Sequence, residues 1–248
     1  MTLLYSIPSV YASGSLSEDI DRIEEKLQVS IVVDETLEGT WKEVTYQLSS
    51  DTVALQEYLL LLEQEYAKYP VGYFTKIGVR TLVVCDKLKL NEQERAAVPD
   101  PYQGILFLSI GFRDNNSTYQ IHVMHHELHH CAEYYHWNTM SYDWDSWTMT
   151  NLPAFAYRGS GASAYEDPSV DWYSISKPTE GFVNLYSTTA AEEDRAELVA
   201  IIMTENEKKQ LDAYLEKDLI LQQKVLLIKV LLTEISGEEN SYWNRIFD

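Results

Sequence analysis

The pattern of apolar and polar residues along the chain predicts a mixture of strands and helices. Short apolar, β-branched runs predict strands at 29–33, 79–85 and 104–112. Apolar residues spaced three and four apart predict helices at 17–27, 52–69, 119–137 and from 190 to about 236. Ser17 and the pair Ser50-Asp51 are the expected caps of the first two helices. Strands followed by packed helices indicate an α+β fold.

The stretch 138–184 shows little periodicity and is rich in Trp, Tyr, Ser, Gly and Pro. An irregular stretch of this length inside a compact domain is usually functional. We interpret residues 17–248 as a single domain, because a chain of this length can bury one large core. Its parts are a sheet and helix to about 137, an irregular cleft segment at 138–189 and a helical part at 190–248.

Residues 1–16 are interpreted as an N-terminal arm or a clipped export signal. Met1 to Ala12 is apolar and ends in small residues, yet no Lys or Arg precedes the apolar run. This segment favours a secreted, periplasmic or cell-surface location over the cytoplasm.

The composition of the chain argues against two classes of binding partner, nucleic acid and the interior of a membrane. With 39 acidic and 19 basic residues the net charge is −20, which argues against binding nucleic acid through a basic surface. No apolar run approaches the roughly 18 residues that a membrane span needs. The two cysteines, Cys85 and Cys131, form no disulfide framework and leave open either one bridge or two free thiols.

The third predicted helix carries the motif HExxH, formed by His126, Glu127 and His130. Histidines four residues apart lie one turn apart on the same face of a helix, so both can bind one small cation. Glu127 stands beside them, where it can hold a water on the same ion. This is half of a tetrahedral zinc site with one position left for water. The apolar residues of the helix lie on another side, which predicts one buried stripe and a histidine face turned toward a cleft. These apolar residues are Ile121, Met124, Leu128, Cys131 and Tyr135.

A catalytic zinc site needs a third protein ligand, and Glu193 is the main candidate. Glu193 and Glu197 share a helix face, so one can bind metal while the other hydrogen-bonds a ligand imidazole. Glu192 lies about 100° off that face. An acidic helix start stabilised by the helix dipole explains the same cluster without metal. His136 is the rival ligand, although a continuous helix would rotate it away from His130. Glu133 lies near the metal face, but three ligands from one straight helix fit a tetrahedral ion poorly.

These residues resemble known metallopeptidases. Tyr186, Glu193 and Glu197 keep the spacing of seven and then four that is found in the gluzincin-type catalytic domain of anthrax lethal factor and in the Pro-Pro endopeptidases. A closer resemblance is to bacterial zinc-binding metallopeptidases. It rests on three blocks in the same order: 125–130, Trp147 with 151–157, and 181–183 with Tyr186 and 193–197.

The resemblance implies a zincin-like fold, with a small twisted sheet, the HExxH helix beneath it and a helical C-terminal part. It implies that 104–112 is the edge strand over the cleft, that Glu193 is the third zinc ligand and that Tyr186 faces the substrate. One zinc ion per chain would then be held by His126, His130 and Glu193.

The predicted activity is zinc-dependent hydrolysis of peptide bonds in a peptide or protein substrate. Glu127 is the expected general base and Tyr186 the expected hydrogen-bond donor to the oxyanion. Glu197 is expected to fix a ligand imidazole. Two alternatives stay open: a catalytically silent zinc-binding or peptide-recognition module, and a zinc or nickel scavenger that binds several ions through the six histidines between His122 and His136.

Overall fold

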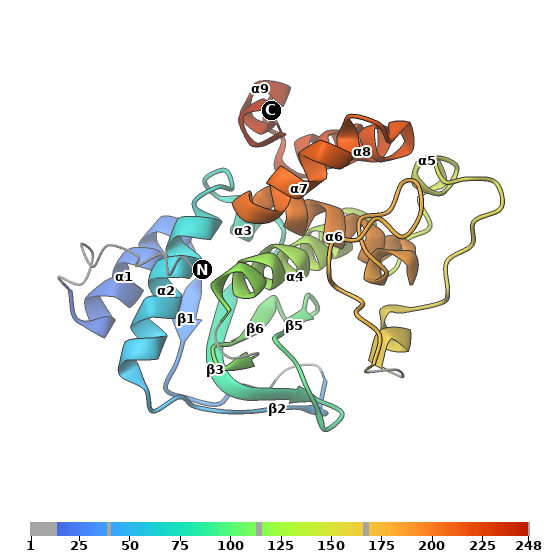
Figure 1. The fold of residues 1–248 in the computed structure, drawn as a ribbon. Helices are drawn as coiled ribbons and strands as arrows, with labels where there is room; N and C mark the ends of the chain where they lie inside the picture. The colour runs from blue at the N-terminus through green and yellow to red at the C-terminus, as the bar shows by residue number, and fades with distance from the viewer. Residues whose placement is uncertain (1–13, 39–40, 113–115, 166–168, 248) are drawn as a thin grey trace, which may run out of the picture.

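The computed structural model describes residues 14–38, 41–112, 116–165 and 169–247 (Figure 1). The interpretation of 1–16 as an arm or export signal falls almost wholly outside these residues. The strands are β1 (Ser30–Val32), β2 (Val44–Gln47), β3 (Thr81–Leu90), β4 (Gln93–Glu94), β5 (Ala97–Asp100) and β6 (Ile105–Ser109). The helices are α1 (Leu16–Leu27), α2 (Thr52–Tyr66), α3 (Tyr73–Lys76), α4 (Ser117–Trp137), α5 (Asp145–Thr148), α6 (Ala191–Met203), α7 (Glu205–Leu215), α8 (Leu219–Ser236) and α9 (Asn240–Phe247), with short 3₁₀ turns η2 (Gly161–Tyr165) and η3 (Tyr186–Thr188). The predicted mixture of a small sheet and helices is therefore confirmed.

The sheet is open and mixed, with strand order β1-β3-β6-β5. Strands β1 and β6 pair with β3 in parallel, whereas β5 pairs with β6 in antiparallel fashion. The second half of β3 extends beyond this core and pairs with β2 and β4. The prediction that 104–112 is the edge strand is wrong, because β6 lies between β3 and β5. The edge is β5, whose Pro99 is tolerated in an edge strand.

The first half of β3 and the whole of β6 are buried on both faces, which explains their continuous apolar sequence. Alternate residues of β3, such as Leu82 and Val84, face the main core together with residues of α4. The intervening residues, such as Val83 and Cys85, face a smaller core on the other side, which is covered by residues around Trp41 and Tyr46. The thiols of Cys85 and Cys131 are both free and buried.

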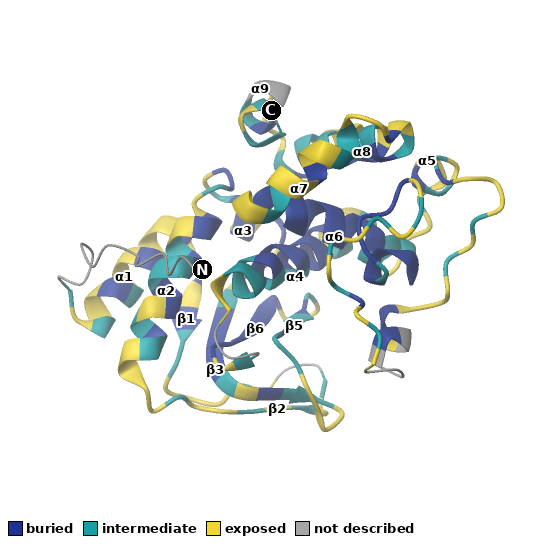
Figure 2. Cartoon of the chain, in the orientation of Figure 1, coloured by how far each residue is buried: buried dark blue, intermediate teal, exposed yellow. Residues whose placement is uncertain are grey.

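Helix α4 crosses the sheet at the centre of the fold, with α1 and α2 to one side and α6 to α9 to the other (Figure 1). Figure 2 shows α4 and α6 as the most continuously buried helices. The prediction of one buried stripe and an open histidine face is wrong. Five of the six histidines are buried, because α6 packs directly over the side of α4 that the sequence pattern left free. Carboxylate partners, described below, make this burial possible.

Local signals explain where most helices begin and end. Helix α1 begins after Ser15, not after Ser17, because Ser15 and Glu18 form a reciprocal capping box. Asp51 caps α2 as predicted, and α2 ends at Tyr66, four residues before Pro70. The predicted helical stretch from 190 to about 236 is divided into three helices, and Gly237 ends the last of them in a left-handed conformation.

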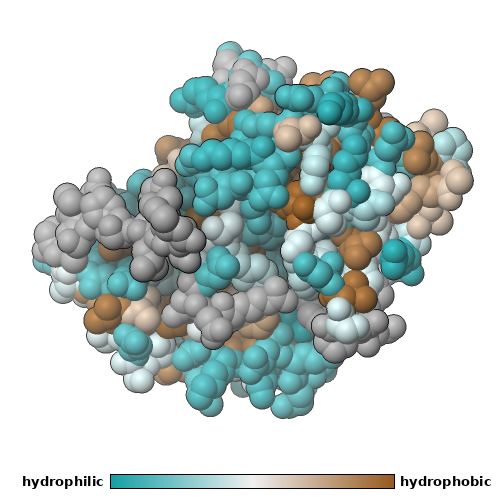
Figure 3. Space-filling model, viewed as in Figure 1, coloured by the Kyte–Doolittle hydropathy of each residue, from teal (hydrophilic) through white to brown (hydrophobic). Residues whose placement is uncertain are grey.

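Most of the face drawn in Figure 3 carries hydrophilic side chains, in keeping with the net charge of −20. Apolar side chains gather toward its upper right, around α8 and α5. None of the described helices is both long enough and apolar enough to span a bilayer.

Candidate metal centre

The two motif histidines and the predicted third ligand lie together between α4 and α6. The Nε2 atoms of His126 and His130 are 3.1 Å apart. Glu193 Oε2 lies 3.1 Å from the first nitrogen and 3.4 Å from the second. Ligand atoms on a tetrahedral zinc ion with bonds of about 2.0–2.1 Å are about 3.3 Å apart. The three atoms therefore form a triangle of the size that fits one zinc ion, and their chemistry, two imidazoles and a carboxylate, suits that ion.

A second group that could hold a cation shares one histidine with the first. It consists of His122, His126 and Glu197. Within this group His122 Nε2 is hydrogen-bonded to Glu197 Oε1 at 3.1 Å. The same oxygen lies 2.9 Å from His126 Nδ1, a contact that does not have the alignment of a hydrogen bond. The other carboxylate oxygen of Glu197 accepts a hydrogen bond from Asn184. The first group is the better metal site, because its two histidine nitrogens and Glu193 Oε2 all face one another.

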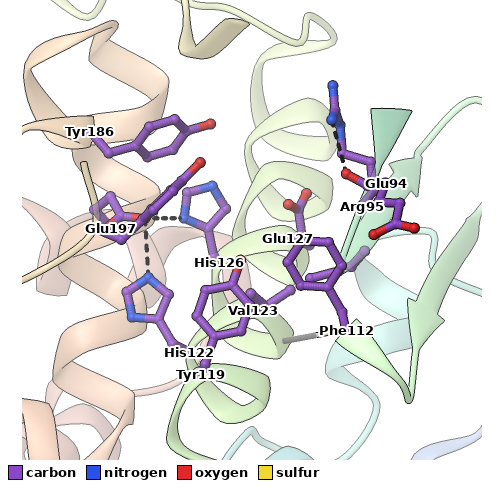
Figure 4. Close-up of a pocket in the computed structure, with 13 residues that line it drawn as sticks. Glu94, Arg95, Phe112, Tyr119, His122, Val123, His126, Glu127, Tyr186 and Glu197 are labelled. Atoms are coloured by element: carbon purple, nitrogen blue, oxygen red, sulfur yellow. Dashed lines mark hydrogen bonds and ion pairs between the residues drawn. The ribbon is translucent and has the colours of Figure 1, made fainter. Parts of the chain in front are cut away.

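Glu127 lies on the opposite side of His126 from Glu197, toward Arg95, which lies between β4 and β5 (Figure 4). It lines a cavity of about 60 Å³ together with His126 and residues of the β4–β5 segment. Burial raises the pKa of the Glu127 carboxyl above its ordinary value, and the nearby imidazoles of His126 and His130 offset this only in part. A carboxylate with a raised pKa beside the metal triangle is suited to accept and return a proton.

Tyr186 lines the same cavity and lies in the turn η3 that precedes α6 (Figure 4). Its ring centroid is 5.9 Å from that of His126. A Cβ atom built on Gly161 would lie 2.6 Å from the Tyr186 hydroxyl and 2.2 Å from Glu193 Oε1. The Tyr186 hydroxyl and the Glu193 carboxylate therefore both pack against the backbone of Gly161, where any larger residue would clash with them.

The histidines and glutamates of the metal centre strongly shift one another's pKa values. Burial alone would raise the pKa of Glu193, but hydrogen bonds from His126 and His130 hold it well below the ordinary range. Burial likewise opposes protonation of His126, but Glu193 and Glu197 raise the pKa of that imidazole. Without metal, the triangle is thus stabilised by protons shared between imidazoles and carboxylates. A cation that binds there replaces these protons.

The remaining histidines do not join the triangle. His125 contacts Tyr69 and Glu65 in the core, and His129 lies 3.1 Å from Glu133 Oε1. His136 is at the end of α4, 3.8 Å from Glu234, and is not brought to the metal triangle. Glu133 and Glu192 also stand outside the two groups of potential ligands among the described residues.

The sequence interpretation missed His122 and Glu207 as parts of this region. His122 Nδ1 lies 2.7 Å from Glu207 Oε2, and His122 Nε2 reaches Glu197. Although burial lowers the pKa of His122, the two carboxylates raise it to about 9. The signal was present in the spacing, because His122 is one helical turn before His126 and therefore on the same face.

Comparison with known proteins supplies a fold likeness. The sequence matches no protein-family model and no curated protein sequence. The structure is similar to the crystal structure of a "putative zinc-binding metallo-peptidase" from Bacteroides caccae, with a TM-score of 0.58 and 16% sequence identity over 93% of this chain and 90% of that chain. The two chains therefore share a fold over nearly their whole lengths.

Proposed function

We propose that this protein is a zinc-dependent peptidase of the gluzincin type. The observation that carries the proposal is the triangle of His126 Nε2, His130 Nε2 and Glu193 Oε2, which has the dimensions of a tetrahedral zinc site. The fold shared with a protein described as a zinc-binding metallo-peptidase supports the same class. Three protein ligands leave one coordination position for water or substrate, as in catalytic zinc sites.

His126, His130 and Glu193 would hold the ion, which when bound acts as a Lewis acid and lowers the pKa of water toward about 7. Glu127 accepts the proton of the attacking water and then delivers it to the leaving amine. The Tyr186 hydroxyl donates a hydrogen bond to the oxygen on which negative charge develops. Glu197 accepts the Nδ1 proton of His126, which keeps the Nε2 lone pair of that imidazole directed at the triangle.

The substrate would lie along the edge strand β5. Ala96 and Ala97 line the cavity beside Glu127, so the edge of the sheet and the proposed base border the same space. An extended peptide can add to such an edge through main-chain hydrogen bonds. The peptide would then bring successive carbonyl groups past the triangle.

The second candidate function is a zinc-binding or peptide-recognition module without catalysis. The small cavity, about 60 Å³, favours this alternative because it leaves little room for a substrate side chain. The two functions differ in their need for Glu127, since a glutamate beside the first ligand is unnecessary for holding zinc.

Glu127→Gln separates them. The variant keeps the size of the side chain but cannot accept a proton, so we expect full zinc content, unchanged melting and a loss in turnover of at least about 10³-fold, or roughly 4 kcal/mol of transition-state stabilisation. The assay is digestion of a broad peptide library with and without a chelator. A zinc-loaded parent that cleaves nothing would favour the module, and equal cleavage by parent and variant would exclude Glu127 as the base.

Elemental analysis of Glu193→Ala and Glu192→Ala tests the ligand assignment with a matched pair of neighbouring residues. We expect zinc to be lost only from Glu193→Ala, because Glu192 stands outside the triangle. The reverse result would mean that α6 presents a different face to α4. Loss of zinc from His136→Ala would instead favour the rival ligand set.

A further inference from the structure

His122 is placed one turn before His126 on α4, yet the metal triangle does not require it. Both of its ring nitrogens face carboxylates: Nδ1 lies 2.7 Å from Glu207 Oε2 and Nε2 lies 3.1 Å from Glu197 Oε1. A ring nitrogen at such a distance from a carboxylate oxygen donates its proton. Nearly all of the His122 side chain is buried, so these two contacts account for its polar atoms.

Glu197 is the point where His122 meets the metal centre. Its Oε1 atom lies near both His122 Nε2 and His126 Nδ1 (Figure 4). Its Oε2 atom accepts a hydrogen bond from Asn184. A buried carboxylate with donors on both oxygens has a fixed orientation. Removing His122 would leave one of these oxygens with a single donor and allow the carboxylate to turn toward Asn184.

The orientation of Glu197 matters because of the tautomer that a metal ligand requires. An imidazole that binds a cation through Nε2 carries its proton on Nδ1, and a fixed acceptor there sets both the tautomer and the angle of the ring. For His126 the carboxylate in reach of Nδ1 is Glu197, whose Oε1 lies 2.9 Å away, although the two are not aligned as a hydrogen bond in this structure. The line of contacts therefore runs from Glu207 on α7 through His122 on α4 and Glu197 on α6 to the ligand His126.

We propose that His122, held by Glu207, is a positioning residue of the metal centre, which keeps Glu197 against His126 and thereby strengthens zinc binding. The inference rests on the zinc site of the proposed function but not on peptide hydrolysis. His122 supplies no atom to the metal triangle; its ring is stacked beside that of His126, with 6.1 Å between the centroids, and its hydrogen bonds connect to the centre through Glu197.

The test compares zinc dissociation constants, measured by competition with a chromophoric chelator, for the parent, His122→Gln, Glu207→Gln and the double variant. Controls with the same substitutions on the same helices are His136→Gln at the end of α4 and Glu205→Gln at the start of α7. The side chains of His136 and Glu205 are much more exposed than those of His122 and Glu207. Among the described residues, Glu205 pairs with Lys209 and His136 with Glu234. Circular dichroism confirms that each variant is folded, and Glu207→Gln, at a partly exposed side chain, disturbs the core least.

We expect His122→Gln to raise the zinc dissociation constant by up to about 10-fold, the lower limit for losing a direct partner of a ligand imidazole, because Glu197 itself remains. Glu207→Gln should give a smaller rise, and the double variant should equal His122→Gln, because Glu207 acts only through His122. The visible spectrum of the cobalt-loaded protein should change in His122→Gln and stay the same in the two controls.

Unchanged zinc affinity in a folded His122→Gln protein would overturn the inference while leaving the proposed function intact. Additive losses in the double variant would overturn it as well, since Glu207 would then act by another route. The expected affinity changes in a parent that binds zinc but cleaves no peptide would support the inference and count against the peptidase. A parent that binds no zinc would overturn both.

Discussion

The buried ion pair between Glu133 and Arg195 gives a quantitative test of how α6 is held against α4. Arg195 Nη2 donates to Glu133 Oε2 at 2.9 Å, Arg195 Nε donates to Oε1, and both side chains are almost fully buried. His129 adds a further contact to Oε1. The guanidinium lies over the ring of Trp137, 5.0 Å from its centroid. Arg195 follows the proposed ligand Glu193 by two residues, so the pair fixes the helix that carries that ligand.

Replacing Glu133 by Gln removes one charge and leaves Arg195 buried without compensation. Breaking such a pair costs about 3–5 kcal/mol of unfolding free energy. The pKa of Glu133 gives a similar figure: burial raises it, but Arg195 and His129 lower it from 4.5 to about 2, a difference worth roughly 3 kcal/mol. Because the amide oxygen of Gln still accepts a hydrogen bond, we expect a loss near the lower limit, about 3 kcal/mol.

The direction of the pH dependence follows from the lowered pKa. Glu133 contributes its full stabilisation above the unfolded value near 4.5, and this contribution is lost as the pH falls through about 2. Parent and Glu133→Gln should therefore differ most at neutral pH and converge in acid. The assay is urea unfolding at a series of pH values with a chelator present, so that zinc binding adds no stability of its own.

Glu234→Gln is the control, because Glu234 is exposed and faces only His136 at 3.8 Å; its effect should stay within about 0.5 kcal/mol. The double replacement Glu133→Leu with Arg195→Met should cost less than the sum of the single replacements, because it leaves no unpaired charge. A loss below about 1 kcal/mol in Glu133→Gln at pH 7, or a difference that persists unchanged to pH 2, would refute this account of the pair.

Two further predictions concern the metal centre itself. Tyr186→Phe should keep zinc and fold but lower kcat by roughly 10²-fold with a much smaller change in KM, and equal activity would mean that Tyr186 is only a structural residue. Gly161→Ala should weaken zinc binding although it removes no ligand, because the new methyl group would stand 2.2 Å from Glu193 Oε1 and displace that carboxylate. Isothermal titration with zinc measures this second effect. Gly159→Ala is the control: its added atom meets nothing within 4 Å, although the backbone at this position is strained for Ala.

The helix that carries the motif was predictable because its signals are local. The spacing of His126 and His130 fixes a shared face, and Glu193 and Glu197 share another by the same rule. The burial of α4 was not predictable from its own pattern, because a histidine counts as polar in that pattern. His122 and His125 are buried against glutamates of other helices, which lie 85 and 60 residues away along the chain. His129 is buried against Glu133 of α4 itself, which in turn pairs with Arg195 of α6.

The edge of the sheet was misassigned for a related reason. Ala97–Asp100 is a strand of four residues that contains Pro99, and a proline in a short run argues locally for a loop. Strand order depends on pairing across the sheet, which the period of a single strand does not specify. The apolar run Ile105–Ser109 was correctly predicted as a strand, but its burial on both faces is the property of an interior strand.

The first turn of α6 shows why the acidic cluster is more than a favourable helix start. Consecutive residues of a helix point about 100° apart, so Glu193, Asp194 and Arg195 reach three different neighbours. Glu193 enters the metal triangle and Arg195 pairs with α4. Asp194 Oδ2 lies 2.7 Å from the buried Lys224 Nζ of α8. A helix dipole favours carboxylates near its start but gives no reason to bury them. The two buried ion pairs fix the rotation of α6 from both sides, and this rotation determines that Glu193, and not Glu192, faces His126.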